Sequence, residues 1–121
     1  MRYVRLYADA SGETHFEQVA LKLDEADYRP PSPLIFVSHA FQAGALQFVR
    51  APSGWVGESI HPPQHQFFFC LQGQVEVRVS DGEKRTFGPG DAVLMEDCSG
   101  KGHSSRVKGA KELIAAIVPL E

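Results

Sequence analysis

The sequence predicts an all-β fold in which short strands form one sandwich or barrel. Three observations support this prediction. Apolar and polar residues alternate with a period of two along most of the chain, an Asp-Gly pair separates two alternating segments, and Gly and Pro residues punctuate the chain. The chain has 121 residues, of which 43% are hydrophobic, so it accommodates one domain of ordinary size with a buried core.

The first half of the chain contributes four predicted strands, at residues 3–6, 16–23, 34–37 and 45–49, and a proline-rich extended crossing segment at residues 28–33. The second of these strands places Val19, Leu21 and Leu23 on one face. Gln18 and Lys22 lie on the opposite face. This alternation is typical of a strand with one buried side.

The second half carries five predicted strands, at residues 66–71, 74–79, 84–87, 92–95 and 111–120. Asp81 and Gly82 stand between two of them, and this pair favours a tight hairpin. The last segment has the length of a short helix. Its β-branched Ile114, Ile117 and Val118 favour a strand instead.

Charge and cysteine content exclude several classes of protein. A formal net charge of −3 and a pI of about 5.9 argue against a nucleic-acid-binding protein, which needs clustered positive charge. Only two cysteines, Cys70 and Cys98, are present. They are too few for a disulfide-dense scaffold or a four-cysteine zinc site.

Targeting and membrane signals are also missing from the sequence. Residues 1–10 alternate between apolar and charged types and lack the apolar centre of a signal peptide. The longest apolar stretch, residues 113–118, is far shorter than the ~20 residues of a membrane helix. We therefore expect a cytoplasmic protein with reduced thiols and with neither a membrane nor a nucleic acid as partner.

The middle of the chain carries a spaced set of polar residues and turns. Four residues separate His61 from Gln66, and six separate Gln66 from Gly73. The run FFFCLQGQVEVRV is followed by FGPGDAVLM, with a Pro-Gly-Asp turn, and then by GKGH, which ends at His103. With these motifs, residues 54–107 resemble the cupins, a family of small conserved-barrel proteins with the pattern G-x5-H-x-H-x3,4-E-x6-G followed by G-x5-P-x-G-x2-H.

The resemblance implies a single-domain cupin, which is a double-stranded β-helix or jelly-roll barrel. The domain would cover residues 1–121. Its N-terminal strands and crossing segment would lie in 1–53, its core motifs in 54–107 and its C-terminal strand in 108–121.

The resemblance also implies a metal site, because a cupin-type metal takes three histidines and a carboxylate. The metal would be one divalent transition ion, Zn, Fe, Ni, Cu or Mn, and its candidate ligands are His61, His65, Gln66 and His103. In the first motif two positions depart from the pattern: Ser59 replaces the first histidine, and Gln66 replaces the glutamate, so the site loses a negative charge. In the second motif the stretch between Gly90 and His103 is two residues longer than the pattern, and Glu96 and Cys98 stand where the proline would fall. If Gln66 points inward, strand alternation turns His65 outward unless Pro62 and Pro63 bend the chain. In the alternative interpretation, His61 and His103 are hydrogen-bonded polar residues at the mouth of the barrel.

A small barrel of this kind encloses one ligand pocket. We expect its wall to include Gln66, Phe68, Cys70, Val77, Met95 and Trp55, together with Val75, Val93 and Phe48. Phe67, Phe69 and Leu71 would point to the outside, and the last strand is apolar on both faces. Two such strands favour a homodimer.

The sequence leaves three functions open. A metal-dependent oxygenase, isomerase or lyase would act on a small organic molecule through a metal held by His61, His103 and a third ligand. A metal-free enzyme would use His61 or His103 as the catalytic acid–base, with Glu96 or Asp97 as an adjacent carboxylate. A non-catalytic cupin would bind a metabolite.

The sequence contains neither G-x4-G-K-[ST] nor G-x-S-x-G, which argues against a phosphate loop and a serine hydrolase.

Overall fold

Strands account for all the regular structure in the part of the chain that the computed structural model describes, residues 1–26 and 33–121. They are β1 (Arg2–Ala8), β2 (Thr14–Ala20), β3 (Asp24–Ala26), β4 (Ile35–Val37), β5 (Gln47–Ala51), β6 (Val56–Ile60), β7 (Gln66–Gln72), β8 (Gln74–Val79), β9 (Lys84–Phe87), β10 (Ala92–Met95), β11 (His103–Lys108) and β12 (Leu113–Pro119). The all-β prediction is confirmed, and each of the nine strands expected from the sequence is present with ends shifted by a few residues.

The alternation pattern gave no boundaries for β3, β6 and β11, because these strands contain few apolar residues. Their sequences are DEA, VGESI and HSSRVK. The crossing segment expected at residues 28–33 lies almost wholly outside the described residues.

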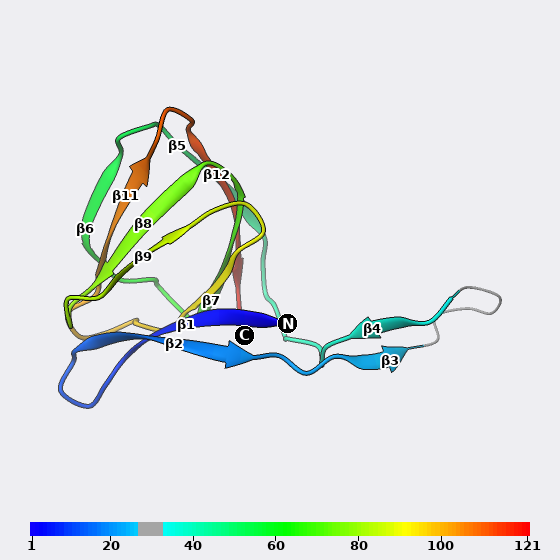
Figure 1. Cartoon of the computed structure of the whole chain (residues 1–121). Helices are drawn as coiled ribbons and strands as arrows, with labels where there is room; N and C mark the ends of the chain where they lie inside the picture. The colour runs from blue at the N-terminus through cyan, green and yellow to red at the C-terminus, as the bar shows by residue number, and fades with distance from the viewer. Residues whose placement is uncertain (27–32) are drawn as a thin grey trace.

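Two facing sheets form the body of the molecule (Figure 1). The larger has the strand order β2-β1-β10-β7-β12-β5, and the smaller has the order β6-β11-β8-β9. Strand β1 pairs in parallel with β10, which inserts the N-terminal hairpin at one edge of the large sheet. Within residues 1–26 and 33–121 there is no helix that could span a membrane.

The predicted hairpin at the Asp-Gly pair is confirmed between β8 and β9, where Val77 faces Arg85 in the ladder. Gly82 in its turn has a φ of +98°, a conformation that side chains other than glycine rarely adopt. At the preceding β7–β8 turn, a Cβ on Gly73 would lie 2.6 Å from the carbonyl oxygen of Glu112. Glycine at this position therefore allows β7 and β8 to turn tightly against the start of β12.

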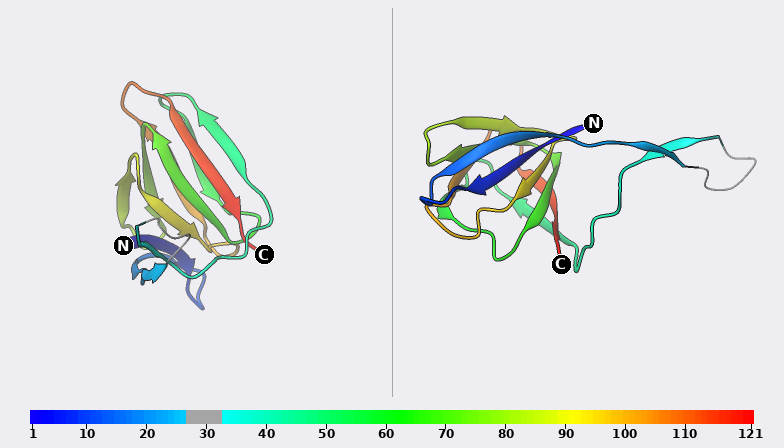
Figure 2. Two further views of the ribbon diagram at one scale, coloured as in Figure 1. Left: turned by 90° about the vertical axis from the view of Figure 1, so that its right-hand side faces the viewer. Right: turned by 90° about the horizontal axis from the view of Figure 1, so that it is seen from below.

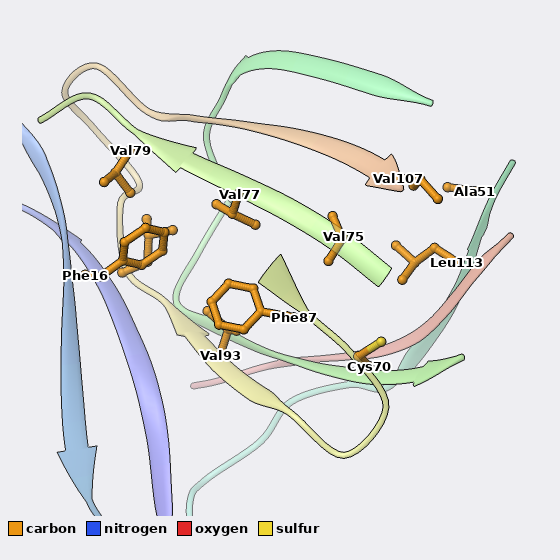
Figure 3. Packing of buried hydrophobic residues seen from close by; sticks show 11 residues of the cluster. Phe16, Ala51, Cys70, Val75, Val77, Val79, Phe87, Val93, Val107 and Leu113 are labelled. Atoms are coloured by element: carbon orange, nitrogen blue, oxygen red, sulfur yellow. The ribbon is translucent and has the colours of Figure 1, made fainter. Parts of the chain in front are cut away.

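The core lies between the sheets. Val75, Val77 and Val79 of β8 are each less than a tenth exposed, and they pack with Phe87 and Val93 in one apolar cluster (Figure 3). Burial of each such side chain stabilises the fold by about 1.5–3 kcal/mol before entropy is considered. The period of two along β8 thus directs one side of the strand into the core.

The outward side of β7 is only partly covered. Phe67 was expected to point outside, and it packs there against residues of its own chain, with ring centroids 5.4 Å from Tyr3 and 4.9 Å from Phe41. Leu71, on the same side of the strand, is 51% exposed.

Strands β3 and β4 form a separate two-stranded hairpin (Figure 1). We call their described residues, 24–26 and 34–37, the arm. The arm projects away from the body in Figure 1 and in the right view of Figure 2.

Candidate functional site

A cavity of about 350 Å³ lies between the two sheets. Its lining is mainly apolar and comes from both sheets: Leu6, Val49, Arg50, Ala51, Pro52, Trp55, Ile60, Pro62, Gln66, Phe68, Val75, Val77, Phe87, Val93, Met95, His103, Ser105, Leu113 and Ile117. Such a cavity is large enough for a small organic molecule.

Most wall residues expected from the sequence line this cavity: Trp55, Gln66, Phe68, Val75, Val77, Val93 and Met95. His103, expected as a ligand or acid–base residue, lines it too. Two of the expected wall residues do not. Cys70 is 1% exposed and lies in the packed core, with its Sγ 3.5 Å from the Gly73 carbonyl oxygen in the β7–β8 turn. Phe48 is 72% exposed, because alternation along β5 turns its neighbour Val49 into the cavity instead.

His103 is a buried, hydrogen-bonded polar residue of the cavity wall. It begins β11, where it faces Val79 on one side and Ile60 on the other, and it is 6% exposed. Its Nδ1 donates a hydrogen bond to Oδ2 of Asp97 at 2.6 Å. The Nε2 atom remains accessible and is bonded to no described residue, so it can accept a hydrogen bond or a proton from a ligand.

Asp97 is fully buried behind His103. Its second oxygen, Oδ1, has no hydrogen-bond partner within residues 1–26 and 33–121. Among the described residues, the carboxylate therefore bonds only to the imidazole, which fixes the ring orientation and the protonated nitrogen.

The loop before His103 is held by the β1–β2 turn. The Thr14 hydroxyl donates to the Gly102 carbonyl oxygen at 2.9 Å, and the Lys101 amide donates to the Gly12 carbonyl oxygen at 2.9 Å. The Lys101 ammonium group also pairs with Glu13 at 2.6 Å. These contacts bring residues about 90 positions apart together and place the start of β11 at the cavity.

The two other candidate histidines lie outside the cavity lining. His61 is exposed, and its Nε2 donates to the Gly100 carbonyl oxygen at 2.7 Å. His65 is 53% exposed at its side chain, with Nδ1 3.1 Å from Oε2 of Glu96. Glu96 also pairs with Arg5 on the surface, so Glu96 and Asp97 serve different histidines.

Ser59, at the position of the missing family histidine, lies in an irregular part of β6. Its φ is +51°, the only positive value among described residues other than glycine. The pairing of β6 with β11 shifts here, since Ile60 faces His103 whereas Gly57 faces Ser105. Positions 58 and 59 therefore bulge from the ladder, and both are exposed.

The donor set does not fit the metal centre that the resemblance implies. Of the four candidate ligands His61, His65, Gln66 and His103, only Gln66 and His103 line the cavity. Across residues 1–26 and 33–121, no three His, Cys, Asp or Glu side chains are arranged to hold a metal ion. One imidazole and one neutral amide are too few for a site built from three imidazoles and a carboxylate.

Sequence reasoning missed several lining residues, among them the polar residues Arg50 and Ser105. Ser105 follows His103 by two positions on β11, so alternation could have placed it on the same face. Leu113 and Ile117 alternate in the same manner on β12, where the sequence pattern indicated only that both faces are apolar.

Comparison with known proteins gives one family match and several solved structures that are similar to this chain. The family model described as "Cupin domain" matches residues 47–118. The cupin domain of Cnp3 from Schizosaccharomyces pombe is similar in structure, with 16% identity, a TM-score of 0.49 and coverage of 89% of this chain and 73% of that chain. A Cupin 2 conserved barrel domain protein from Salinispora arenicola shares 18% identity, with a TM-score of 0.48 and coverage of 84% and 76%. KdgF from Halomonas sp. shares 26% identity, with a TM-score of 0.42 and coverage of 81% and 87%. No curated protein matches the chain.

Proposed function

This chain belongs to the cupin domain family, and we propose that it binds a small, uncharged, largely apolar molecule in the cavity between its sheets. The observation that carries this proposal is the apolar wall, which is interrupted inside the barrel by a few polar groups. A few polar groups in an otherwise apolar wall are the usual means of orienting a small ligand.

Charge at the cavity favours a neutral ligand. The only basic residue of the lining besides His103 is Arg50, whose side chain is 77% exposed and is paired with Glu112 at 2.9 Å. Asp97 already offsets any positive charge on His103. A carboxylate or phosphate entering the cavity would lose its hydration without meeting a free cation, which is costly.

The polar groups also indicate which neutral group the ligand carries. His103 offers Nε2 as an acceptor, and the amide of Gln66 offers both a donor and an acceptor. A hydroxyl group on an apolar body, such as a phenol or an enol, would donate to Nε2 and accept from Gln66.

Three matched probes test this assignment: 4-propylphenol, propylbenzene and 3-phenylpropionate. We expect 4-propylphenol to bind about 2- to 12-fold more tightly than propylbenzene, because one neutral hydrogen bond is added. The carboxylate 3-phenylpropionate should bind most weakly. Binding is measured by calorimetry and by the fluorescence of Trp55, the only tryptophan, which lines the cavity.

Two variants test whether the preference for 4-propylphenol over propylbenzene comes from His103. His103→Leu should remove the preference for the phenol over propylbenzene, whereas His61→Ala, outside the lining, should keep it. Failure of all three probes to bind would contradict the proposal. So would stoichiometric metal uptake from Zn, Fe, Ni, Cu or Mn that is lost in the His61→Ala/His103→Ala double variant.

Metal-free acid–base catalysis is the second candidate function, and the Asp97–His103 pair favours it. A buried carboxylate orients the imidazole, and Nε2 of this lining residue is bonded to no described residue. A bound ketone with an acidic C–H next to its carbonyl could transfer that proton to Nε2, giving an enolate and an imidazolium.

A further inference from the structure

The apolar outer side of the large sheet is covered in part by the chain itself and is exposed at Phe48 and Leu71. In the ladder, Phe48 of β5 faces Ala116 of β12, which in turn faces Phe69 of β7. The three side chains form a row on the side opposite the cavity, and we call this side of β7, β12 and β5 the outer face. Phe48 is 72% exposed, and Leu71 nearby on β7 is 51% exposed.

The arm presents a second set of uncovered apolar side chains. Leu34, Ile35 and Phe36 are 54%, 40% and 60% exposed. A two-stranded hairpin is marginally stable in water when no further strand or apolar surface supports it. The arm would therefore be stabilised by packing against an apolar surface, and the body of the same chain does not provide one.

The arm and the outer face point to the same side of the molecule. In Figure 1, β5 and β12 form the side of the body from which the arm extends. When this side is turned toward the viewer, in the left view of Figure 2, β12 and β5 lie in front and the arm comes forward. We call the arm and the outer face together the exposed apolar surface, because each carries large apolar side chains that are at least 40% exposed.

We propose that a second copy of this chain occupies this surface, with the arm of each copy lying over the outer face of the other. Such an arrangement is isologous, because the same two surfaces are used twice about a twofold axis. One chain carries both the projecting element and the uncovered face, so two copies cover both without any other partner.

The exposed parts of Phe36 and Phe48, counted in both copies, would bury roughly 400–650 Å², which is about a third to a half of the ~1,200 Å² at which stable interfaces begin. The other exposed apolar side chains, Leu34, Ile35 and Leu71, would have to supply the rest. Both surfaces also carry charge. Glu25 faces Phe36 across the arm. Arg50 follows Phe48 by two positions on the outer face, where it is 77% exposed and pairs with Glu112 of its own copy.

Analytical ultracentrifugation of the full chain, from low micromolar to several hundred micromolar, tests the proposal. We expect a dimer whose dissociation constant rises at least about tenfold in Phe36→Glu and in Phe48→Lys, because each buries an unpaired charge. The double variant Phe36→Glu/Phe48→Lys should regain much of the lost affinity, since the new charges would face each other. Val56→Lys is the matched control: Val56 is 53% exposed but lies on β6 of the small sheet.

A wild-type chain that stays monomeric at the highest concentration would overturn the proposal. A dimer that both single variants leave intact would do the same. Loss of the dimer in both single variants without recovery in the double variant would show that the arm and the outer face do not meet. If a charged variant fails to fold, Phe36→Ser and Phe48→Ser replace it. Hydrogen exchange of the wild type should also slow at Ile35–Val37 and Gln47–Ala51 as concentration rises.

Discussion

Two histidine–carboxylate clusters with similar distances lie in different environments. In the cavity wall, Nδ1 of His103 lies 2.6 Å from Asp97, and the two side chains are 5% and 0% exposed. On the surface, the two ring nitrogens of His15 lie 2.7 Å from Asp9 and 2.7 Å from Asp81, and the imidazole is 29% exposed. The buried cluster keeps one ring nitrogen free for a ligand, whereas the surface cluster uses both nitrogens to join two turns. Only the first is therefore available for chemistry.

The two clusters share one structural support. Thr14, which precedes His15, bonds to Ser80 and to the Gly102 carbonyl oxygen next to His103. The backbone of the β1–β2 turn also meets the loop before β11 where Gly12 and Gly100 cross. A change at this crossing should disturb both clusters together.

Replacing Gly100 with alanine should have the largest effect on stability. A Cβ there would lie 2.5 Å from the Gly12 carbonyl oxygen, and the φ of Gly100 is +81°. Strain and overpacking together should lower the free energy of unfolding by about 2–5 kcal/mol, measured by urea denaturation.

Gly54→Ala is the control, because Gly54 has a φ of +82° but nothing within 4 Å of the added Cβ. Its free energy of unfolding should fall only by the cost of the left-handed backbone conformation, about 1–2 kcal/mol. Equal losses in the two variants would show that the crossing of Gly12 and Gly100 is not tight.

Asp97→Ala should have the next largest effect. It removes the acceptor of the buried His103 Nδ1–H, and an unsatisfied buried donor costs about 1–3 kcal/mol of unfolding free energy. Asp97→Asn retains an oxygen acceptor and should lose less. Urea denaturation of both variants measures the difference, and an unchanged stability in Asp97→Ala would mean that the pair does not hold the wall together.

The same variant tests the acid–base candidate. In deuterated buffer, phenylacetone should exchange the hydrogens beside its carbonyl faster with the wild type than with His103→Gln. The exchange rate with Asp97→Ala should lie between these two rates. Exchange is followed by proton NMR. No acceleration by the wild type would leave ligand binding without catalysis as the function.

The sequence predicted the strands well because burial of one side leaves a period of two. It also predicted most of the cavity wall, since Gln66 and Phe68 on β7 and Val75 and Val77 on β8 follow that alternation. It placed Cys70 in the cavity wall, although the thiol turns toward the β7–β8 turn. A strand pattern gives the side on which a residue lies but not how far along the barrel the cavity extends.

Long-range partners were harder to predict. The sequence offered both Glu96 and Asp97 as neighbours of His103, and the structure separates them: Asp97 is buried with His103, whereas Glu96 pairs with Arg5 and His65 outside. Which acid turns inward depends on the packing of a loop against the β1–β2 turn. Motif spacing alone does not specify such a contact.

The smallest effect that we expect is a pH dependence of stability from the surface cluster. Hydrogen bonds to Asp9 and to Asp81 raise the pKa of His15 above its ordinary value of 6.5. Because both ring nitrogens bond to carboxylates, the bound form is the imidazolium, which donates from both. Its contribution is complete below the ordinary pKa and is lost as the pH rises through the raised value. The urea midpoint of the wild type should therefore fall as the pH increases above about 6.5, and His15→Gln should flatten this slope.

His39→Gln is the control, because His39 is an exposed histidine outside the cluster, and it should keep the wild-type slope. If the urea midpoint of His15→Gln changes with pH as steeply as that of the wild type, other groups cause the pH dependence. The surface cluster would then not contribute to folding stability.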